Sequence, residues 1–101
     1  MSDCKVLKTH RFFDEVTTTG ETAQYLTDYR FGGATERTIQ GVLTSGAQVK
    51  LYTYTSPTDE TVEHLVSTFA ASTFSTVIDG PVAKIKVEMV SGGTAWIEGL
   101  V

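Results

Sequence analysis

The chain has 101 residues, of which 41% are hydrophobic and 20% are charged, and its formal net charge is -4. A chain of this length and composition is expected to fold as one domain around one core, which excludes a disordered tail as its main content. The acidic balance argues against a nucleic-acid partner, because phosphate contacts need a basic surface.

Cysteine and histidine are scarce, with Cys4 as the only cysteine and His10 and His64 as the only histidines. One cysteine cannot form an intramolecular disulfide, and these residues lack the spacing of a zinc site. The sequence has no apolar run of the ~20 residues that span a bilayer and no apolar signal-peptide core. We therefore expect synthesis in the cytoplasm, with no membrane and no cofactor as partner.

The first predicted strand covers residues 4–13 and contains the adjacent Phe12 and Phe13. Successive side chains of a strand point to opposite faces, so one of these two rings is expected to cover something outside the core. The polar residues 14–22 predict a loop.

Three further segments alternate with the period of two that is typical of strands, namely 23–31, 37–43 and 47–54. The first has a mostly aromatic face and ends at a pair of glycines, 32 and 33. The second and third are separated by a short turn that contains Gly46, so they are predicted to form a β-hairpin.

The segment 59–72 supports two predictions. Its apolar residues Val62, Leu65, Val66 and Phe69 have the i, i+3, i+4, i+7 spacing of one helical face. Read with a period of two, the segment is also a passable strand, and every neighbouring segment is β. We expect a strand and keep one short helix near 59–71 as the alternative.

The clearest alternation lies in residues 83–89, where apolar side chains alternate with Lys84, Lys86 and Glu88. A turn with two glycines follows at 91–94, and residues 95–100 read as a returning strand. This pattern predicts a C-terminal β-hairpin.

In total the sequence predicts an all-β domain over residues 1–101, built from about seven or eight short strands. Turn signals separate these strands at short intervals, as in a two-layer antiparallel β-sandwich or jelly roll. A parallel sheet is excluded, because its strands would alternate with long helices.

No group of residues predicts an active site. Ser45 lies in a predicted turn and not on a nucleophile elbow, and Cys4 lies too near the chain end to be well oriented by His10. The histidines lie in predicted strands, where a surface role is commoner than a catalytic one. We expect no catalytic residues and no enzyme activity.

Two pairs of adjacent acids, at 14–15 and 59–60, are weak candidates for calcium ligands, and solvated turn carboxylates are the commoner interpretation. A small basic cluster, formed by Lys5, Lys8, His10 and Arg11, is interpreted as a solvated strand face, with contact with an acidic partner protein as the alternative. We expect no metal site.

Aromatic side chains offer the remaining candidates for binding. Flat rings stack on the apolar faces of sugars, so a carbohydrate-binding face is one hypothesis, and contact with a partner protein is favoured over it. The sugar-face candidates are Tyr25, Tyr29, Tyr52, Tyr54 and Trp96. The partner-interface candidates are Phe12, Phe13, Tyr52, Tyr54 and Trp96.

Residues 39–100 resemble the small β-sandwich and jelly-roll virion proteins of tailed bacteriophages. The resemblance is one of layout and lies in GVLTSGAQVKLYTY, VEHLVSTFAAS and DGPVAKIKVEMVSGGTAWIEGL. The chain departs from that layout by lacking a DGxxW hairpin motif. Residues 1–35 match no known pattern and are interpreted as including an extended arm.

The resemblance implies a non-enzymatic virion protein of the capsid decoration, cement or head-fibre type. Its implied partners are the major capsid protein or other virion proteins, and its implied state is a symmetric homo-oligomer, with a trimer favoured. The alternative hypothesis is a carbohydrate-binding or receptor-binding β-sandwich module of a phage tail or a secreted enzyme.

Overall fold

The computed structural model describes residues 8–27 and 36–101, and in these residues every regular element is a β-strand. The six strands are β1 (Thr9–Val16), β2 (Thr22–Leu26), β3 (Glu36–Tyr54), β4 (His64–Asp79), β5 (Lys84–Ser91) and β6 (Ala95–Leu100). The helix alternative near 59–71 is therefore wrong, because β4 begins at His64 and the preceding residues form a loop. Within the same residues no helix is long and apolar enough to cross a membrane.

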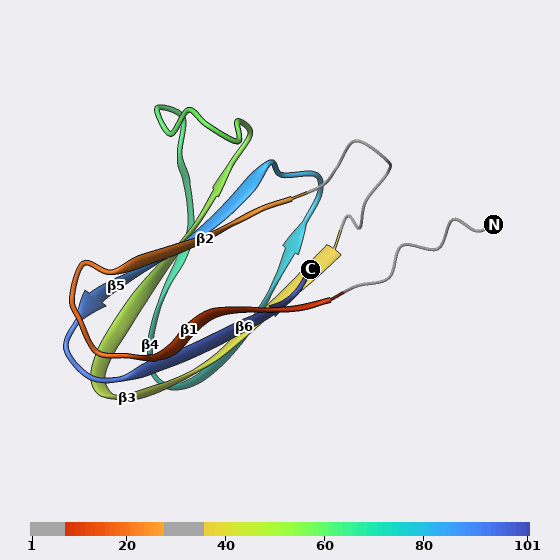
Figure 1. Cartoon of the computed structure of the whole chain (residues 1–101). Helices are drawn as coiled ribbons and strands as arrows, with labels where there is room; N and C mark the ends of the chain where they lie inside the picture. The colour runs from red at the N-terminus through yellow and green to blue at the C-terminus, as the bar shows by residue number, and fades with distance from the viewer. Residues whose placement is uncertain (1–7, 28–35) are drawn as a thin grey trace.

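The predicted two-layer antiparallel sandwich is confirmed, and its basis is a long hairpin of β3 and β4 that bends in the middle. The first half of β3, through Leu43, pairs with β6, and the second half, from Gln48, pairs with β5. Since β1 pairs with β6 and β2 with β5, one layer has the order β1-β6-β3-β4 and the other β2-β5-β3-β4. We call the layer that contains β1 and β6 the first layer, and the layer that contains β2 and β5 the second layer. Figure 1 shows the two layers diverging from the bends of β3 and β4.

Both predicted hairpins are wrong, although the strands and turns themselves exist. Residues 44–47 lie within β3, where Leu43 pairs with Ser72 and Gln48 with Ala70, so the glycine turn bends one strand instead of joining two. Similarly, residues 92–94 lead from β5 in the second layer to β6 in the first. This arrangement lets the apolar faces of the two layers cover each other, which pairing β5 with β6 in one sheet would not achieve.

Hydrogen bonds join the bend of β3 to the connection between β5 and β6. Thr44 donates its backbone N–H to the Thr94 carbonyl at 3.0 Å, and the Thr94 N–H donates to Thr44 Oγ1 at 2.8 Å. The Ser91 hydroxyl donates to the Gly46 carbonyl at 2.7 Å. The two places where the chain passes between layers are thus fixed against each other.

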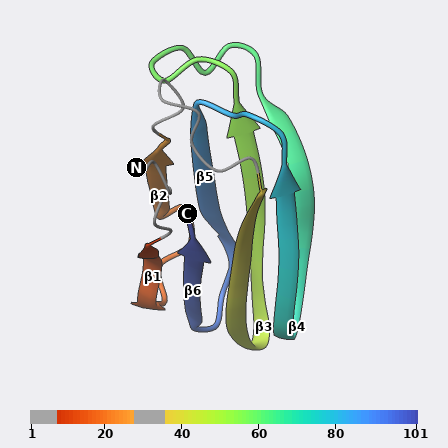
Figure 2. The same cartoon turned by 90° about the vertical axis from the view of Figure 1, so that its right-hand side faces the viewer.

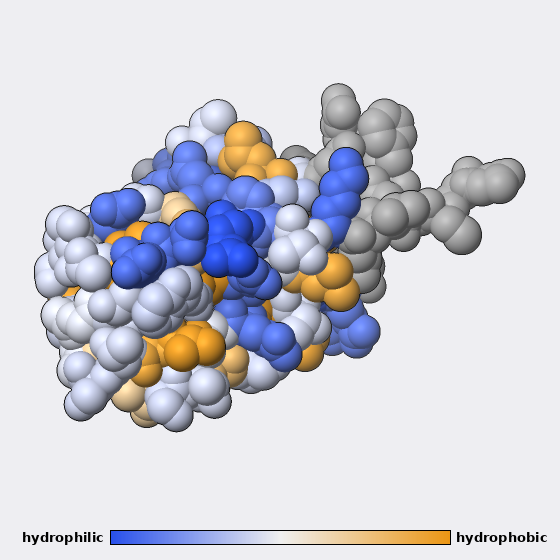
Figure 3. Space-filling view, turned by 60° about the horizontal axis from the view of Figure 1, so that its bottom comes forward, coloured by the Kyte–Doolittle hydropathy of each residue, from blue (hydrophilic) through white to orange (hydrophobic). Residues whose placement is uncertain are grey.

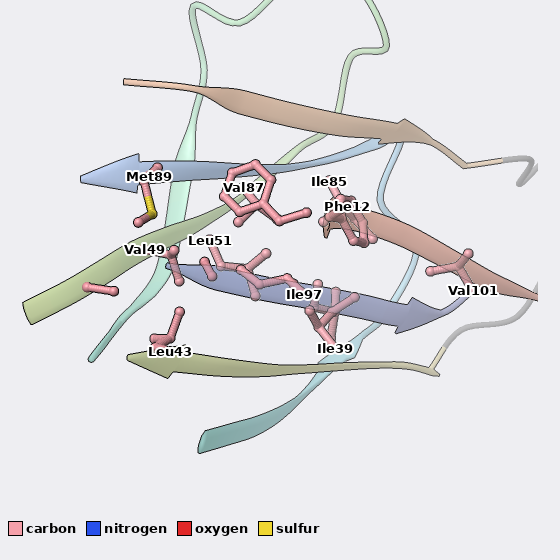
Figure 4. Packing of buried hydrophobic residues seen from close by; sticks show 14 residues of the cluster. Phe12, Ile39, Leu43, Val49, Leu51, Ile85, Val87, Met89, Ile97 and Val101 are labelled. Carbon is pink, nitrogen blue, oxygen red and sulfur yellow. The ribbon is translucent and has the colours of Figure 1, made fainter. Parts of the chain in front are cut away.

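The core fills the space between the layers, as Figure 4 shows. It takes residues from every strand except β2, whose Ala23 and Tyr25 pack against its margin. Its members are Phe12, Phe13, Ile39, Leu43, Ala47, Val49, Leu51, Ile78, Ile85, Val87, Met89, Ala95, Ile97 and Val101.

The expectation that Phe12 or Phe13 would cover something outside the core is wrong. Their exposed fractions are 6% and 1%. The register shifts between the pairs Arg11–Glu98 and Phe13–Ile97, and such a β-bulge breaks the strict alternation so that adjacent side chains point inward together.

The first 35 residues, in which an arm was expected, contribute β1 and β2 to the sandwich. The predicted positions Cys4, Tyr29 and glycines 32 and 33 lie outside the described residues. Figure 2 shows the two layers from the side, with β4 along one edge of the molecule and β1 and β2 along the opposite edge.

Candidate binding surfaces

The outer face of the second layer carries alternating tyrosines and lysines on β3 and β5. Tyr52 pairs with Lys86 and Tyr54 with Lys84 across the two strands. Lys84 Nζ lies 4.7 Å from the centre of the Tyr54 ring, and Lys86 Nζ lies 5.3 Å from that of Tyr52. These distances are in the range of cation–π interactions, so each ammonium group covers an aromatic face.

The loop before β4 closes this face with two glutamates. Glu60 accepts hydrogen bonds from Lys84 and, at 3.1 Å, from Lys86, and Glu63 accepts one from the Tyr54 hydroxyl. Hydrogen bonds from the two lysines lower the pKa of the Glu60 carboxyl. Burial and the Glu63 carboxylate raise the pKa of Tyr54 to about 12.

The two tyrosines were expected to be the least buried aromatic rings, and for Tyr54 this expectation is wrong. Only 2% of Tyr54 is exposed, because the lysines and the loop cover it. Tyr52 is half-buried, and its hydroxyl donates to Glu88 Oε1 at 3.0 Å. Burial and this bond raise the pKa of Tyr52. The rings thus have their polar groups engaged within the chain.

The outer face of the first layer is hollowed instead of filled. Its hollow has a volume of about 590 Å³ and is lined by Trp96 of β6. Polar and apolar residues of β3, β4 and β6 complete the lining. The lining residues are Gln40, Gly41, Val42, Thr73, Phe74, Ser75, Trp96 and Glu98. Figure 3 views the molecule from this side and shows hydrophilic surface interrupted by apolar patches.

Two polar groups of the hollow are held in place by neighbours. The Gln40 amide donates from Nε2 to Ser75 Oγ at 3.2 Å, and Glu98 forms an ion pair with Arg11 of β1. Val42 is 49% exposed beside them. The hollow thus combines one indole ring with an amide, a carboxylate and hydroxyl groups, which suits a ligand with both apolar faces and polar edges.

At the floor of the hollow, Gly41 lets β3 and its neighbours come close together. A Cβ atom built on Gly41 would lie 2.5 Å from the Phe74 ring and 3.0 Å from the Trp96 carbonyl oxygen. The sequence indicated Trp96 as a candidate, but Gln40 and Ser75 gave no signal, because only the pairing of β3 with β4 and β6 brings them beside it.

The described residues bring together no group of three or more side chains able to hold a metal ion. Glu60 is bonded to lysines, and Asp59 Oδ1 accepts the Thr61 backbone N–H at 2.9 Å. His10 packs with its ring centre 4.8 Å from that of Phe12, and His64 is exposed at the start of β4. The two histidines belong to β1 and β4, which lie at opposite edges of the sandwich (Figure 2).

Comparisons with known proteins place this architecture among the β-sandwich modules. The crystal structure of the SPBc2 prophage-derived protein YomS matches with a TM-score of 0.70 and 15% sequence identity, over 98% of this chain and 95% of that one. The C-terminal CBM6 of LamC, a marine laminarinase from Zobellia galactanivorans, matches with a TM-score of 0.57 and 11% identity, over 93% of this chain and 100% of that one.

No protein-family model and no curated protein matches the sequence. At these identities the structural matches establish the fold, which is an all-β sandwich of the kind found in the prophage-derived protein and in the carbohydrate-binding module.

Proposed function

We propose that the protein is a non-enzymatic structural protein of a bacteriophage particle. The observation that carries the proposal is the match to the prophage-derived protein YomS, which extends over nearly the whole length of both chains. The surfaces support it as well. The hollow beside Trp96 lies on an open sheet face, which is suited to contact with other proteins.

Within the particle, we place the protein on the head as a decoration or cement protein that contacts the major capsid protein. A small sandwich gains stability and avidity when its exposed edges are covered in a symmetric array. The outer face of the first layer, with Trp96 and the exposed Val42, is the candidate contact. The buried Phe12, Phe13 and Tyr54 have little surface to offer.

The composition of purified particles tests the proposal. Particles released by the source strain are banded by density, and their proteins are quantified by mass spectrometry. The account predicts that this chain is enriched with the particle at a fixed ratio to the main shell protein. Its presence in the infected cell together with its absence from purified particles would contradict the proposal, and gold labelling on tails alone would contradict the placement on the head.

Carbohydrate binding is the second candidate function, and the hollow beside Trp96 is the observation that favours it. The hollow offers a ring for stacking together with the fixed Gln40 amide and the Glu98 carboxylate. The match to a carbohydrate-binding module of the same architecture supports this candidate.

Trp96 is the single tryptophan of the chain, so its fluorescence reports directly on this hollow. Titration with a panel of soluble polysaccharides, laminarin included, should shift the emission if a sugar binds there. Calorimetry should then show binding lost in Trp96→Ala and kept in Leu26→Ala, which changes a 55% exposed residue on the other layer. Absence of binding across the panel would exclude this candidate.

A further inference from the structure

The β4 edge of the sandwich has register shifts at Val66 and at its central bend, but it lacks the charges and prolines that usually protect an edge against pairing with another strand. β4 has 16 residues, and among the described residues it pairs only with β3, which leaves its other side open along both layers (Figure 2). Residues 65–78 contain no charged residue and no proline. Exposed edges are normally blunted by charges, proline, bulges or short strands.

The opposite edges follow that usual rule. β1 has charged residues at Arg11, Asp14 and Glu15 and contains the bulge beside Phe13, while β2 has only five residues. The edges therefore differ in charge and length, since only the long β4 edge is uncharged, over residues 65–78.

Two aromatic rings of β4 remain incompletely covered at this edge. Phe69 and Phe74 stack on each other with ring centres 4.0 Å apart and planes 10° apart, across the bend of the strand. Both pack against the core but are only half-buried. A strand added beyond β4 would cover the exposed part of these rings.

The sequence of β4 matches its own reverse in residue class. Residues 66–77 read VSTFAASTFSTV, with their centre between Ala71 and Ser72, which is also the centre of the strand. An antiparallel copy centred there places phenylalanine opposite phenylalanine and small residues opposite one another, whereas Val66 packs against the core and Val77 is 55% exposed. The resulting pairs are Val66–Val77, Ser67–Thr76, Thr68–Ser75, Phe69–Phe74, Ala70–Thr73 and Ala71–Ser72.

The ends of β4 are compatible with the same arrangement. His64 and Asp79 are the first and last residues of the strand. Antiparallel pairing brings the histidine end of one strand beside the aspartate end of the other, so no like charges meet. The bend at the centre is retained too, because a two-fold axis through the bend superimposes the first-layer half of β4 on the second-layer half.

We propose that two copies of this chain pair through their β4 strands, antiparallel and about a two-fold axis at the bend. The first layer of each copy then continues into the second layer of the other copy. The two Phe69–Phe74 stacks meet at the centre of the contact. This isologous contact closes on itself, so it yields a dimer and not a fibre. The inference does not depend on the function proposed above, because it concerns the chain alone.

A charge-pair experiment tests this contact in solution. Thr68 and Ser75 are exposed and face each other across the proposed axis, so Thr68→Glu with Ser75→Glu puts two pairs of carboxylates opposite each other. The matched variant, Thr68→Glu with Ser75→Lys, puts two opposite-charge pairs there instead. Molar mass is measured by light scattering during gel filtration, and circular dichroism checks that each variant keeps its β-structure.

We expect the unmodified chain and the opposite-charge variant to be dimers, and the double-glutamate variant to dissociate at least tenfold more readily. A monomeric unmodified chain would overturn the proposal, as would equal dimerisation of the two variants. A trimer, the state implied by the resemblance to virion proteins, would also overturn it, because a closed trimer does not use an antiparallel two-fold contact.

Discussion

At the scale of single residues, Gly93 lets the connection between β5 and β6 approach the bend of β3 closely. Its φ is +125°, and a Cβ atom there would lie 2.7 Å from the backbone N of Ala47. Its neighbour Gly92 has open space around its Cβ position. Two adjacent glycines with the same appearance in the sequence thus have different structural roles.

We predict that Gly93→Ala lowers the free energy of unfolding by about 2–4 kcal/mol, through backbone strain and overpacking against Ala47. Gly92→Ala, as the matched control, should change it by less than about 0.5 kcal/mol, as surface substitutions usually do. Denaturant unfolding with an unchanged m-value measures both. Equal stabilities of the two variants would show that the bends are not packed as described.

Glu60 stabilises the second layer in a pH-dependent way. Only 4% of the Lys84 side chain is exposed, so it relies on this carboxylate for a charged partner. The two lysines lower the pKa of Glu60 below its usual value of 4.5, so folding favours the ionised form. The stabilisation is therefore complete above that usual value and is lost as the pH falls through the lower pKa of the folded state.

Accordingly, Glu60→Gln should lower the midpoint temperature of unfolding at neutral pH. In strong acid the midpoint temperatures of Glu60→Gln and of the unmodified chain should become equal. The control Glu36→Gln changes an exposed glutamate and should leave the midpoint nearly unchanged at both pH values. Thermal unfolding followed by circular dichroism measures all three proteins. A difference between Glu60→Gln and the unmodified chain that persists in acid would exclude the charge pairing as its cause.

At the scale of elements, the alternation of side chains was enough to predict most strands, but not their partners. The period of two in residues 37–43, 47–54 and 83–89 identified strands correctly, because it reflects one buried face. A glycine turn, however, is compatible both with a hairpin and with a passage between layers. The choice depends on long-range burial, and this is also why Gln40 and Ser75 were not predicted to lie beside Trp96.

Engineered disulfides distinguish the observed pairing from the predicted hairpin. In a Cys4→Ser background, cysteines at Gln40 and Glu98, or at Lys50 and Glu88, lie on directly paired residues and should oxidise readily. Cysteines at Glu88 and Glu98 join β5 to β6, lie on the outer faces of opposite layers and should stay reduced. Mass measurement after alkylation reads the outcome, and a bond in the third pair alone would restore the hairpin.

At the scale of the whole molecule, the chain is a bent double sheet with a hollow on the outer face of one layer and an edge along β4 that is uncharged over residues 65–78. These features are compatible with the structural role that we propose in a phage particle. The fold class was predicted correctly from the alternating segments and the turn spacing, although the described residues form six strands and not seven or eight. The shape of the surfaces did not, since they arise where residues distant in sequence meet on neighbouring strands.

Cryo-electron microscopy of the particles released by the source strain tests this role most directly. We expect density on the particle surface into which the two-layer sandwich fits. A fully interpreted particle map without any density for the sandwich, from a strain that produces the chain, would contradict the account.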